Sequence, residues 1–476
     1  MMENSPQLSS TGQPVADRRG QISWALFEFA RSPYVSLIFV FVFAPYFANN
    51  VVGDPVKGQE LWGLANTVIG FFIAIMAPIL GAISDRTGQR KKWIAGIIAI
   101  MAPCCFVLWF AMPGAESGLP IPVILVLVAT LLACFMISEM FHNAMLPSIA
   151  SADRVGSLSG FGISTGNVGT LIALVGMLFG IAFPASGLVD WQFLPDQPWF
   201  GLDPETHEHN RISGPIAGIW LAVFIMPMML WTPDIPSTGV KAGQAVREGL
   251  NQVWATVRRA RQMKNIGLFL LARMFYNDGK VAILAYSGIY AAGIFEWGLV
   301  EMLIFAISLA PFSISGGLVG GWLDRRFGSK RAIQITIGTT CLVMLGAVSS
   351  TPDRLLFFFP YDAAAAGPVW SFPYFQSLPE LIFISMFMLM AASITAAFAN
   401  SRAMMARLAP VSMMSQFFGL YALSGTVTAF LGHGIVTFFT GTFDSQVAGF
   451  SSVIILLVTG LVLMHWVREE RAEEIA

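Results

Sequence analysis

The chain has 476 residues, of which 55% are hydrophobic and only 12% are charged, and its formal net charge is −1. A soluble domain carries about 25% charged residues, so this deficit excludes soluble enzymes, nucleic-acid-binding proteins and secreted disulfide scaffolds. A hydrocarbon core of about 30 Å takes roughly 20 apolar residues per helix. The composition therefore predicts a polytopic membrane protein.

Proline, glycine and charged residues divide the chain into apolar runs of about the length of a membrane-spanning helix. The first half contains runs at 22–47, 61–83, 93–112, 121–141, 156–183 and 213–231. The second half contains runs at 265–292, 297–322, 332–348, 381–400, 417–439 and 447–467. We therefore expect an all-α membrane protein with twelve transmembrane helices, six on each side of one polar stretch.

The expected organisation follows from these runs. It comprises a tail at 1–20, a six-helix bundle at 21–232, a linker at 233–264, a second six-helix bundle at 265–467 and a tail at 468–476. Lysine and arginine gather in the tails, the linker and alternate loops, so the positive-inside rule places both termini in the cytoplasm. Residues 1–20 are polar and lack the apolar core of a signal peptide. The first span is therefore expected to direct its own insertion.

The linker carries apolar residues at helical spacing, with arginines around them. The apolar positions are Val246, Leu250, Val253, Trp254 and Val257. The pattern favours an amphipathic helix on the cytoplasmic membrane surface, and a calmodulin-binding helix is the alternative. Four cysteines all fall in apolar runs, which indicates no redox or metal role.

Two loops predicted on the outer side also attract attention. His207 and His209 lie beside acidic residues in the loop at 196–210, where a metal site would need a third ligand, so a solvated loop is preferred. The loop at 355–375 is rich in Phe, Tyr and Trp. Such residues favour an interfacial aromatic belt, and a lid over an outward cavity is the alternative.

A loop motif occurs once in each half of the chain. After the second run comes the segment 81–92, which contains Asp85, Arg86, Gly88 and Arg90. After the eighth run comes the segment 320–331, with Asp324, Arg325 and Gly328 at nearly the same spacing. Both copies join a small-residue helix end and an acid to a tight glycine turn and a basic cluster. The motif resembles the signature loop of the major facilitator superfamily.

The resemblance implies two parallel, pseudo-symmetric six-helix bundles, the major facilitator fold. It also implies a gating role for Asp85, Arg86, Arg90, Asp324 and Arg325, since an acid near a helix N-terminus can hold helix ends together. The alternative is that the basic residues only enforce topology.

A closer resemblance connects the chain to the vacuole-effluxer-like branch of that superfamily. It is carried by residues 23–32, by Asn143-Ala144-Met145-Leu146-Pro147, by Tyr276-Asn277-Asp278-Gly279, and by Asn400-Ser401-Arg402 with residues 417–421. The chain departs from the family pattern at Glu28, Arg31 and Lys280, and His433 replaces a usual proline. The family includes an amino-acid exporter of the fungal vacuole, so an efflux transporter is implied.

Charged residues inside the runs are costly and are expected to face the bundle interior or a partner. Glu28 and Arg31 share a helix face in the first run, where a local ion pair is the structural alternative to substrate or proton work. In the seventh run Arg273, Asn277 and Lys280 share a face. The candidate substrate or proton-coupling residues are Glu28, Arg31, Asn143, Asn277, Asp278, Lys280, Arg402 and His433. Glu28 is the preferred proton carrier and Asp278 is the second choice.

These patterns predict a secondary transporter rather than an enzyme. The solute is expected to be small and polar, anionic or zwitterionic, and moved by alternating access with protons, in the direction of export. No ATP-binding loop motif is present, and neither a cofactor nor a metal is expected. The expected partners are the solute, H⁺ and the bilayer of a bacterial inner membrane; no nucleic acid is expected and no oligomer is required. A transport-inactive receptor or scaffold on the same fold is the alternative.

Overall fold

The computed structural model describes most of the chain at residue level. The described residues are 9, 14–114, 118–151, 154–234, 263–409 and 428–469, with isolated positions at 243, 244, 247, 251, 254, 258, 417, 420, 421, 424 and 425. Contacts divide the chain into two compact units. Unit 1 comprises Met1–Tyr46, Ile75–Ala185 and Leu194–Gln252, and unit 2 comprises Phe47–Ala74, Ser186–Phe193 and Val253–Ala476.

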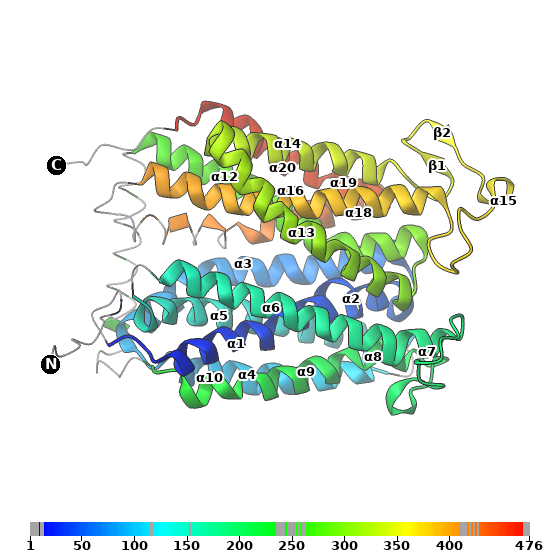
Figure 1. Cartoon of the computed structure of the whole chain (residues 1–476), viewed down its shortest axis with the longest axis horizontal. Coiled ribbons are helices and arrows are strands. Elements are labelled where there is room, and N and C mark those ends of the chain that lie inside the picture. The colour runs from blue at the N-terminus through cyan, green and yellow to red at the C-terminus, as the bar shows by residue number, and fades with distance from the viewer. Residues whose placement is uncertain are drawn as a thin grey trace. The chain divides into compact units, whose positions relative to one another are not determined.

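Helices dominate the first half of the chain, as Figure 1 shows. They are α1 (Arg18–Tyr34), α2 (Phe43–Tyr46), α3 (Pro55–Thr87), α4 (Arg90–Val107), α5 (Ile121–Ile149), α6 (Val155–Met177), α7 (Phe183–Ser186), α8 (Glu208–Arg211), α9 (Ser213–Phe224) and α10 (Met226–Trp231). Short π-helices occur at Val35–Val40 (η1), Phe47–Val51 (η2) and Leu178–Ala182 (η4). Turns of 3₁₀-helix occur at Leu108–Phe110 (η3) and Trp199–Gly201 (η5).

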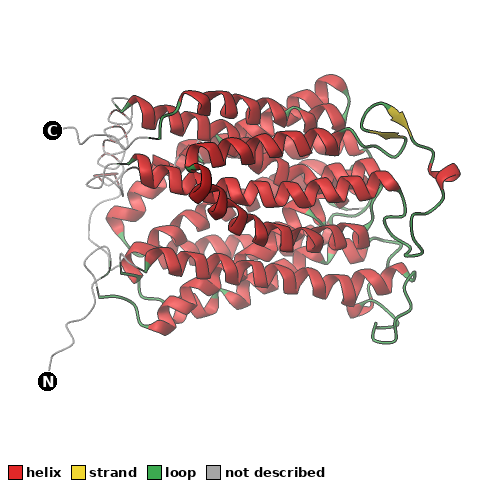
Figure 2. Cartoon of the chain, turned by 45° about the horizontal axis from the view of Figure 1, so that its top comes forward, coloured by secondary structure: helices red, strands yellow, loops and turns green. Residues whose placement is uncertain are grey.

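The second half is also helical, apart from one small hairpin that Figure 2 shows in yellow. Its helices are α12 (Lys264–Phe295), α13 (Leu299–Phe327), α14 (Ser329–Val348), α15 (Ala363–Ala366), α16 (Leu378–Leu408), α18 (Ala429–Phe443), α19 (Gln446–Ser451) and α20 (Val453–Trp466). The hairpin pairs β1 (Arg354–Leu355) with β2 (Phe359–Pro360) in antiparallel register, Arg354 opposite Pro360.

The described helices occur at the positions of the predicted spans. Ten stretches of helix are long and apolar enough to cross a membrane. The seventh position is filled by α12, which has 32 residues and carries buried charges, and the eleventh contains α18, of which 15 residues are described. The protein is therefore a multi-pass membrane protein.

In unit 1, α1 forms the centre of the packing through small residues on α6. A Cβ added to Gly166 would lie 2.4 Å from Ser32 Oγ, and one added to Gly169 would lie 2.8 Å from the carbonyl oxygen of Phe29. Small residues let two membrane helices approach closely when both are surrounded by lipid. Unit 2 uses the same device where α13 crosses α16, because a Cβ on Gly316 would lie 2.2 Å from Ala392 O.

Pro33 interrupts the hydrogen-bond ladder of α1, and unit 1 compensates for it. A proline has no N–H, so the carbonyl four residues earlier, that of Phe29, loses its helical donor. Trp220 of α9 supplies a replacement, since its Nε1 donates to Phe29 O at 2.9 Å. The chain continues from α1 into the π-helix η1 directly after this point. The Phe29 carbonyl is thus paired despite Pro33.

Candidate functional site

The first cluster of buried charges forms where α1 meets α5 in unit 1. Glu28 and Arg31 are 9% and 7% exposed, and Arg31 Nη2 donates to Glu28 Oε2 at 2.8 Å. Arg31 Nη1 also lies 3.1 Å from Oε2 of Glu139, whose side chain is 42% exposed. The guanidinium stacks 4.5 Å above the ring centroid of Phe135. One cation therefore joins two carboxylates on different helices.

His142 completes this cluster, and the sequence analysis did not single it out. It is fully buried on α5, and its Nδ1 lies 3.4 Å from Oε1 of Glu28. It sits directly before Asn143, the first residue of the family-like Asn-x-x-Leu-Pro segment. Asn143 itself is exposed. Helical geometry turns neighbouring side chains about 100° apart, so the residue beside the recognised motif position, and not that position, reaches α1.

The second cluster of buried charges belongs to α12 in unit 2. Arg273 Nη1 donates to the carbonyl oxygen of Tyr421 at 2.7 Å and to Ser424 Oγ at 2.6 Å. Its guanidinium lies 3.6 Å from the centroid of the Tyr421 ring. A Cβ on Gly425 would lie 3.1 Å from that guanidinium and 3.4 Å from Asn277 Nδ2. Arg273 and Asn277 thus share the face of α12 that meets the segment before α18.

Lys280 and Asp278 are buried on α12, and Lys280 has no hydrogen-bond partner among the described residues. Lys280 is 0% exposed, and its Nζ makes no hydrogen bond but lies 3.6 Å from the Phe398 ring centroid and 5.2 Å from that of Tyr276. Asp278 is 1% exposed, and the Thr428 hydroxyl and the Arg273 guanidinium lie close enough to interact with its carboxylate, although neither oxygen has a hydrogen bond of good geometry. A buried ionisable group normally has a partner, so both groups have capacity for a ligand or a proton.

The two remaining candidates of unit 2, Arg402 and His433, differ in burial. Arg402 on α16 is exposed. His433 on α18 is 8% exposed, and its Nδ1 lies 3.1 Å from the hydroxyl of Tyr286 on α12. A single hydroxyl partner and no facing carboxylate are the surroundings of a helix-contact histidine. His433 thus links α18 to α12 rather than to the charged groups.

The predicted gate of the first half centres on the start of α4. Its backbone N–H groups at Arg90 and Lys91 donate to the two carboxylate oxygens of Asp234 at 3.1 and 3.0 Å, and Lys91 Nζ donates to Thr232 O at 2.7 Å. Arg90 Nη1 donates to the carbonyl of Ala144 on α5. The side chains of Asp85 and Arg86 lie outside the described residues. Asp234, which the sequence analysis did not identify, is the acid that caps α4.

The second half repeats this arrangement with a carboxylate that follows its last helix. Glu469 accepts from the N–H of Ser329 at 2.8 Å and of Lys330 at 3.2 Å, and Lys330 Nζ donates to His465 O at 2.8 Å. Asp234 and Glu469 thus occupy equivalent places after α10 and α20.

The carboxylate of Asp324 pairs with Arg407, which lies on a different helix. Its Oδ2 accepts from Arg407 Nη2 at 2.7 Å, and Arg407 also contacts Glu469. Arg325, which was expected to take part, is exposed, and none of the described ion pairs involves it. Arg407 at the end of α16 is therefore the cation that holds the α13–α14 turn to the end of α20.

Replacing Arg407 with glutamine should loosen this end of unit 2. Exposed ion pairs contribute about 0.2–1 kcal/mol each, so loss of two should speed hydrogen exchange at Ser329 and Lys330 by about two- to thirtyfold. Hydrogen–deuterium exchange with mass spectrometry measures it. Arg326→Gln is the matched control, since Arg326 is exposed on the same turn. Equal exchange in the two variants would show that Arg407 does not hold the turn.

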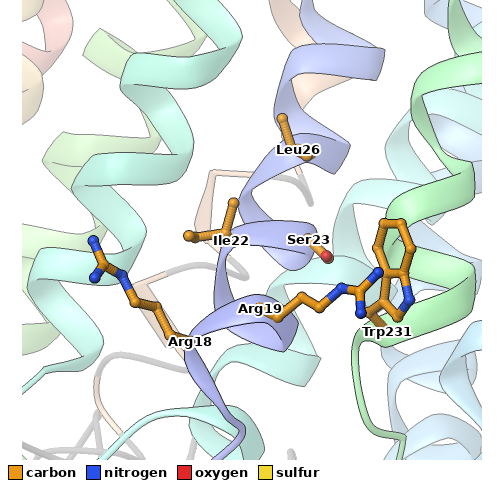
Figure 3. Close-up of a pocket in the computed structure, with 6 residues that line it drawn as sticks. All are labelled: Arg18, Arg19, Ile22, Ser23, Leu26 and Trp231. Atoms are coloured by element: carbon orange, nitrogen blue, oxygen red, sulfur yellow. The ribbon is translucent and has the colours of Figure 1, made fainter.

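A pocket of about 440 Å³ opens beside the start of α1 and is separate from both charge clusters. Figure 3 shows the guanidinium of Arg19 against the indole of Trp231, while Arg18 points away from it. Ile22 and Leu26 complete the apolar lining. Arginine and tryptophan beside apolar side chains are typical of a membrane interface, so this hollow suits a lipid chain better than a polar solute.

The two histidines of the loop at 196–210 lie close together. The rings of His207 and His209 are 5.6 Å apart, and burial lowers the pKa of His207. Within the described part of the chain, no group of three or more His, Cys, Asp or Glu side chains is arranged to hold a metal ion.

Comparison with known proteins identifies the family to which the chain belongs. The profile described as vacuole effluxer Atg22 like matches residues 63–476. The chain belongs to this family. It is 24% identical over 461 residues to an uncharacterized MFS-type transporter, YxiO, of Bacillus subtilis (strain 168), covering 95% of this chain and 96% of the relative.

Solved structures agree on the fold. A D-xylose–proton symporter superposes with a TM-score of 0.62 at 12% identity, covering 94% and 96% of the two chains. A POT family transporter in complex with 5-aminolevulinic acid superposes with a TM-score of 0.63 at 13% identity, covering 96% and 99%. The predicted major facilitator fold, with twelve helices in two pseudo-symmetric bundles, is confirmed. The protein is a membrane transporter of this type.

The predicted linker helix is described at only a few positions, and the aromatic loop at 355–375 is only partly exposed. In the linker, the described positions between 243 and 258 are helical and exposed, and Trp254 is 60% exposed. Val246, Leu250, Val253 and Val257 lie outside the described residues. The aromatic loop is mixed, since Phe358 is 82% exposed while Phe375 is 5% exposed and packs edge-on against Trp297 at 5.1 Å.

Proposed function

We propose that this transporter couples the export of a small polar solute to proton movement by alternating access, and that the solute carries an anionic or zwitterionic group. The observation that carries the proposal is the burial of two charged groups on α12: Lys280, which has no hydrogen-bond partner among the described residues, and Asp278, which interacts with Thr428 and Arg273. A protein keeps such costly groups in a membrane helix when they take part in function. Export is the proposed direction because the family is described as effluxers.

The charge types fit this solute class. The Lys280 ammonium group lies beside aromatic rings and within electrostatic reach of Arg273 and Arg402, so it presents an open donor in a positively charged place. A carboxylate or phosphate ester oxygen would satisfy it. Asn400 Nδ2 on α16 is another buried donor without a hydrogen-bond partner among the described residues. Asp278 can receive a proton or an ammonium group.

Glu28 is the proposed proton carrier and Asp278 the second choice. Glu28 lies in a cluster where its neighbours can change its charge, because a shift of Arg31 between Glu28 and Glu139 would alter how well its ionised form is stabilised. The proposed location is a bacterial inner membrane, with both termini and the linker in the cytoplasm. This orientation rests on the distribution of lysine and arginine. Asp85, Arg86, Arg90, Asp324 and Arg325 remain the proposed gate, now joined by Asp234, Arg407 and Glu469.

The direct test is transport by purified protein in liposomes, screened against amino acids, organic acids and phosphate esters with and without an imposed pH gradient. Gradient-driven accumulation of one anionic or zwitterionic solute is expected. Equal transport with and without the gradient would refute proton coupling. No transport of any solute by folded protein would favour the receptor or scaffold alternative.

Glu28→Gln tests the carrier. This variant should lose gradient-driven accumulation, because an amide cannot cycle a proton, while solute counterflow remains measurable. Glu60→Gln is the matched control, since Glu60 pairs with Lys57 at 2.7 Å on a more exposed surface. Accumulation at the unaltered level in Glu28→Gln would assign the proton to Asp278 or to no carrier at all, and Asp278→Asn separates these two outcomes.

A further inference from the structure

His142 is held in one fixed position between α1 and α5. Its Nε2 lies 2.9 Å from the carbonyl oxygen of Trp24, and Trp24 Nε1 donates to the carbonyl oxygen of His142 at 3.1 Å. Its ring stacks on the Trp24 ring at 4.3 Å and lies 4.4 Å from the ring of Phe27. The side chain is fully buried. These contacts fix which ring nitrogen faces which neighbour.

The hydrogen-bond partners determine where the protons of this ring lie. A carbonyl oxygen only accepts, so Nε2 must carry the hydrogen that it gives to Trp24. In a neutral imidazole, Nδ1 then has only a lone pair. That lone pair would face Oε1 of Glu28 at 3.4 Å, and no other described group bonds to Nδ1. Two acceptors would oppose each other in a buried place, which is unfavourable without a proton between them.

The charge balance of the cluster leads to the same conclusion. Glu28 and Glu139 provide two negative charges, and Arg31 provides one positive charge. The other helices packed on α1 add none, because α6, α9 and α10 contain no titratable residue between their first and last residues. One more proton makes the cluster neutral. A charged imidazole would also be attracted to the faces of the aromatic rings on either side.

We propose that Glu28 and His142 together bind one proton, which lies between Oε1 of Glu28 and Nδ1 of His142. Because Arg31 already donates to Oε2 of Glu28, the carboxylate is stabilised and the proton belongs mainly to the imidazole. Loading the pair forms a Glu28–His142 ion pair that draws α5 to α1. Releasing the proton leaves two acceptors in opposition and weakens that contact. The use of this proton in transport rests on the proposed proton coupling, but its binding does not.

The binding can be measured without substrate or gradient. Protein labelled with ¹⁵N-histidine in lipid nanodiscs gives signals from five histidines, and His142→Gln identifies the one from His142. At neutral pH this ring is expected to carry hydrogen on both nitrogens, whereas the ring identified by His433→Gln is neutral. An infrared band of a protonated carboxyl that disappears in Glu28→Gln would belong to Glu28. The proposal would be overturned if His142 is neutral with no hydrogen on Nδ1 and this band is also missing from the unaltered protein.

A second variant keeps the test valid if His142→Gln does not fold. Glu28→Gln retains the ring, its stacking and its bonds to Trp24, and its amide N–H can donate to Nδ1. The ring of His142 should therefore become neutral in this variant. A ring that stays doubly protonated in Glu28→Gln would show that the proton does not depend on Glu28, and would refute the shared site.

Failure of this inference can be told apart from failure of the proposed function. If the pair is protonated but transport ignores a pH gradient, the shared proton stands and the coupling does not. If His142 is neutral beside an ionised Glu28 while transport still follows the gradient, the shared site is refuted and the coupling belongs to another group.

Discussion

Replacing Arg31 with glutamine is expected to cost about 3–5 kcal/mol of the free energy of unfolding, the loss typical when one partner of a buried ion pair is removed. Arg31 is the only cation shown within ion-pair distance of both Glu28 and Glu139 among the described residues. Its removal leaves the buried carboxylate of Glu28 without its strongest donor. Thermal melting in detergent, followed by size-exclusion analysis, measures the effect.

The double variant Glu28→Gln with Arg31→Gln separates charge from packing. It removes both members of the 2.8 Å pair while keeping side chains of similar size, so most of the lost stability should return. Arg19→Gln is the control, because Arg19 is an exposed arginine of the same helix. A double variant as unstable as Arg31→Gln alone would show that the pair contributes through packing rather than charge.

Replacing Lys280 with methionine should raise the stability of the protein and weaken its binding of the solute. Methionine keeps the apolar stem against Phe398 but removes an ammonium group that has no hydrogen-bond acceptor among the described residues. An unsatisfied buried donor costs about 1–3 kcal/mol, more when charged, so the melting temperature should rise. If the ammonium group binds the solute, affinity should fall by about ten- to hundredfold, the equivalent of one charge-assisted hydrogen bond.

The informative result is the combination of these two changes. Higher stability with lost binding would identify Lys280 as a group kept for function at a cost to folding. Lys264→Met serves as the control, since Lys264 is the exposed first residue of the same helix. Unchanged solute binding in Lys280→Met would contradict its proposed role, and lower stability would show that the ammonium group contributes to folding.

The sequence was sufficient to predict the helices, and the reason is physical. In a bilayer every backbone polar group must be paired within the protein, and a helix does this within its own segment. An apolar run of about 20 residues therefore favours a helix. The Glu28–Arg31 pair was predictable for the same kind of reason, because residues three apart lie on one face of a helix. The spacing of residues along the chain was therefore enough to predict the helices and the ion pair within one helix.

Contacts between distant segments could not be predicted in this way. Trp24 and His142 are 118 positions apart, and nothing in the periodicity of either helix pairs them. Arg407 lies beyond the predicted run at 381–400 and Glu469 beyond the predicted run at 447–467, so the run pattern assigns a contact to neither. The one available signal was the repeat itself, since Asp234 and Glu469 each follow the last helix of their half. Comparing the halves beyond the glycine turns would have indicated both acids.

The cap at Glu469 makes the boundary after α20 part of the folded protein. The Glu469 carboxylate accepts hydrogen bonds from the first N–H groups of α14. A fusion protein that replaces the chain from Glu469 onward would therefore lose a structural contact, whereas a fusion that keeps Glu469 would retain it. The equivalent acid of the first half, Asp234, lies inside the chain because the linker follows it, so a fusion at either end leaves it in place. An engineered split of the protein into its halves should therefore keep Asp234 on the first fragment, where α4 uses it.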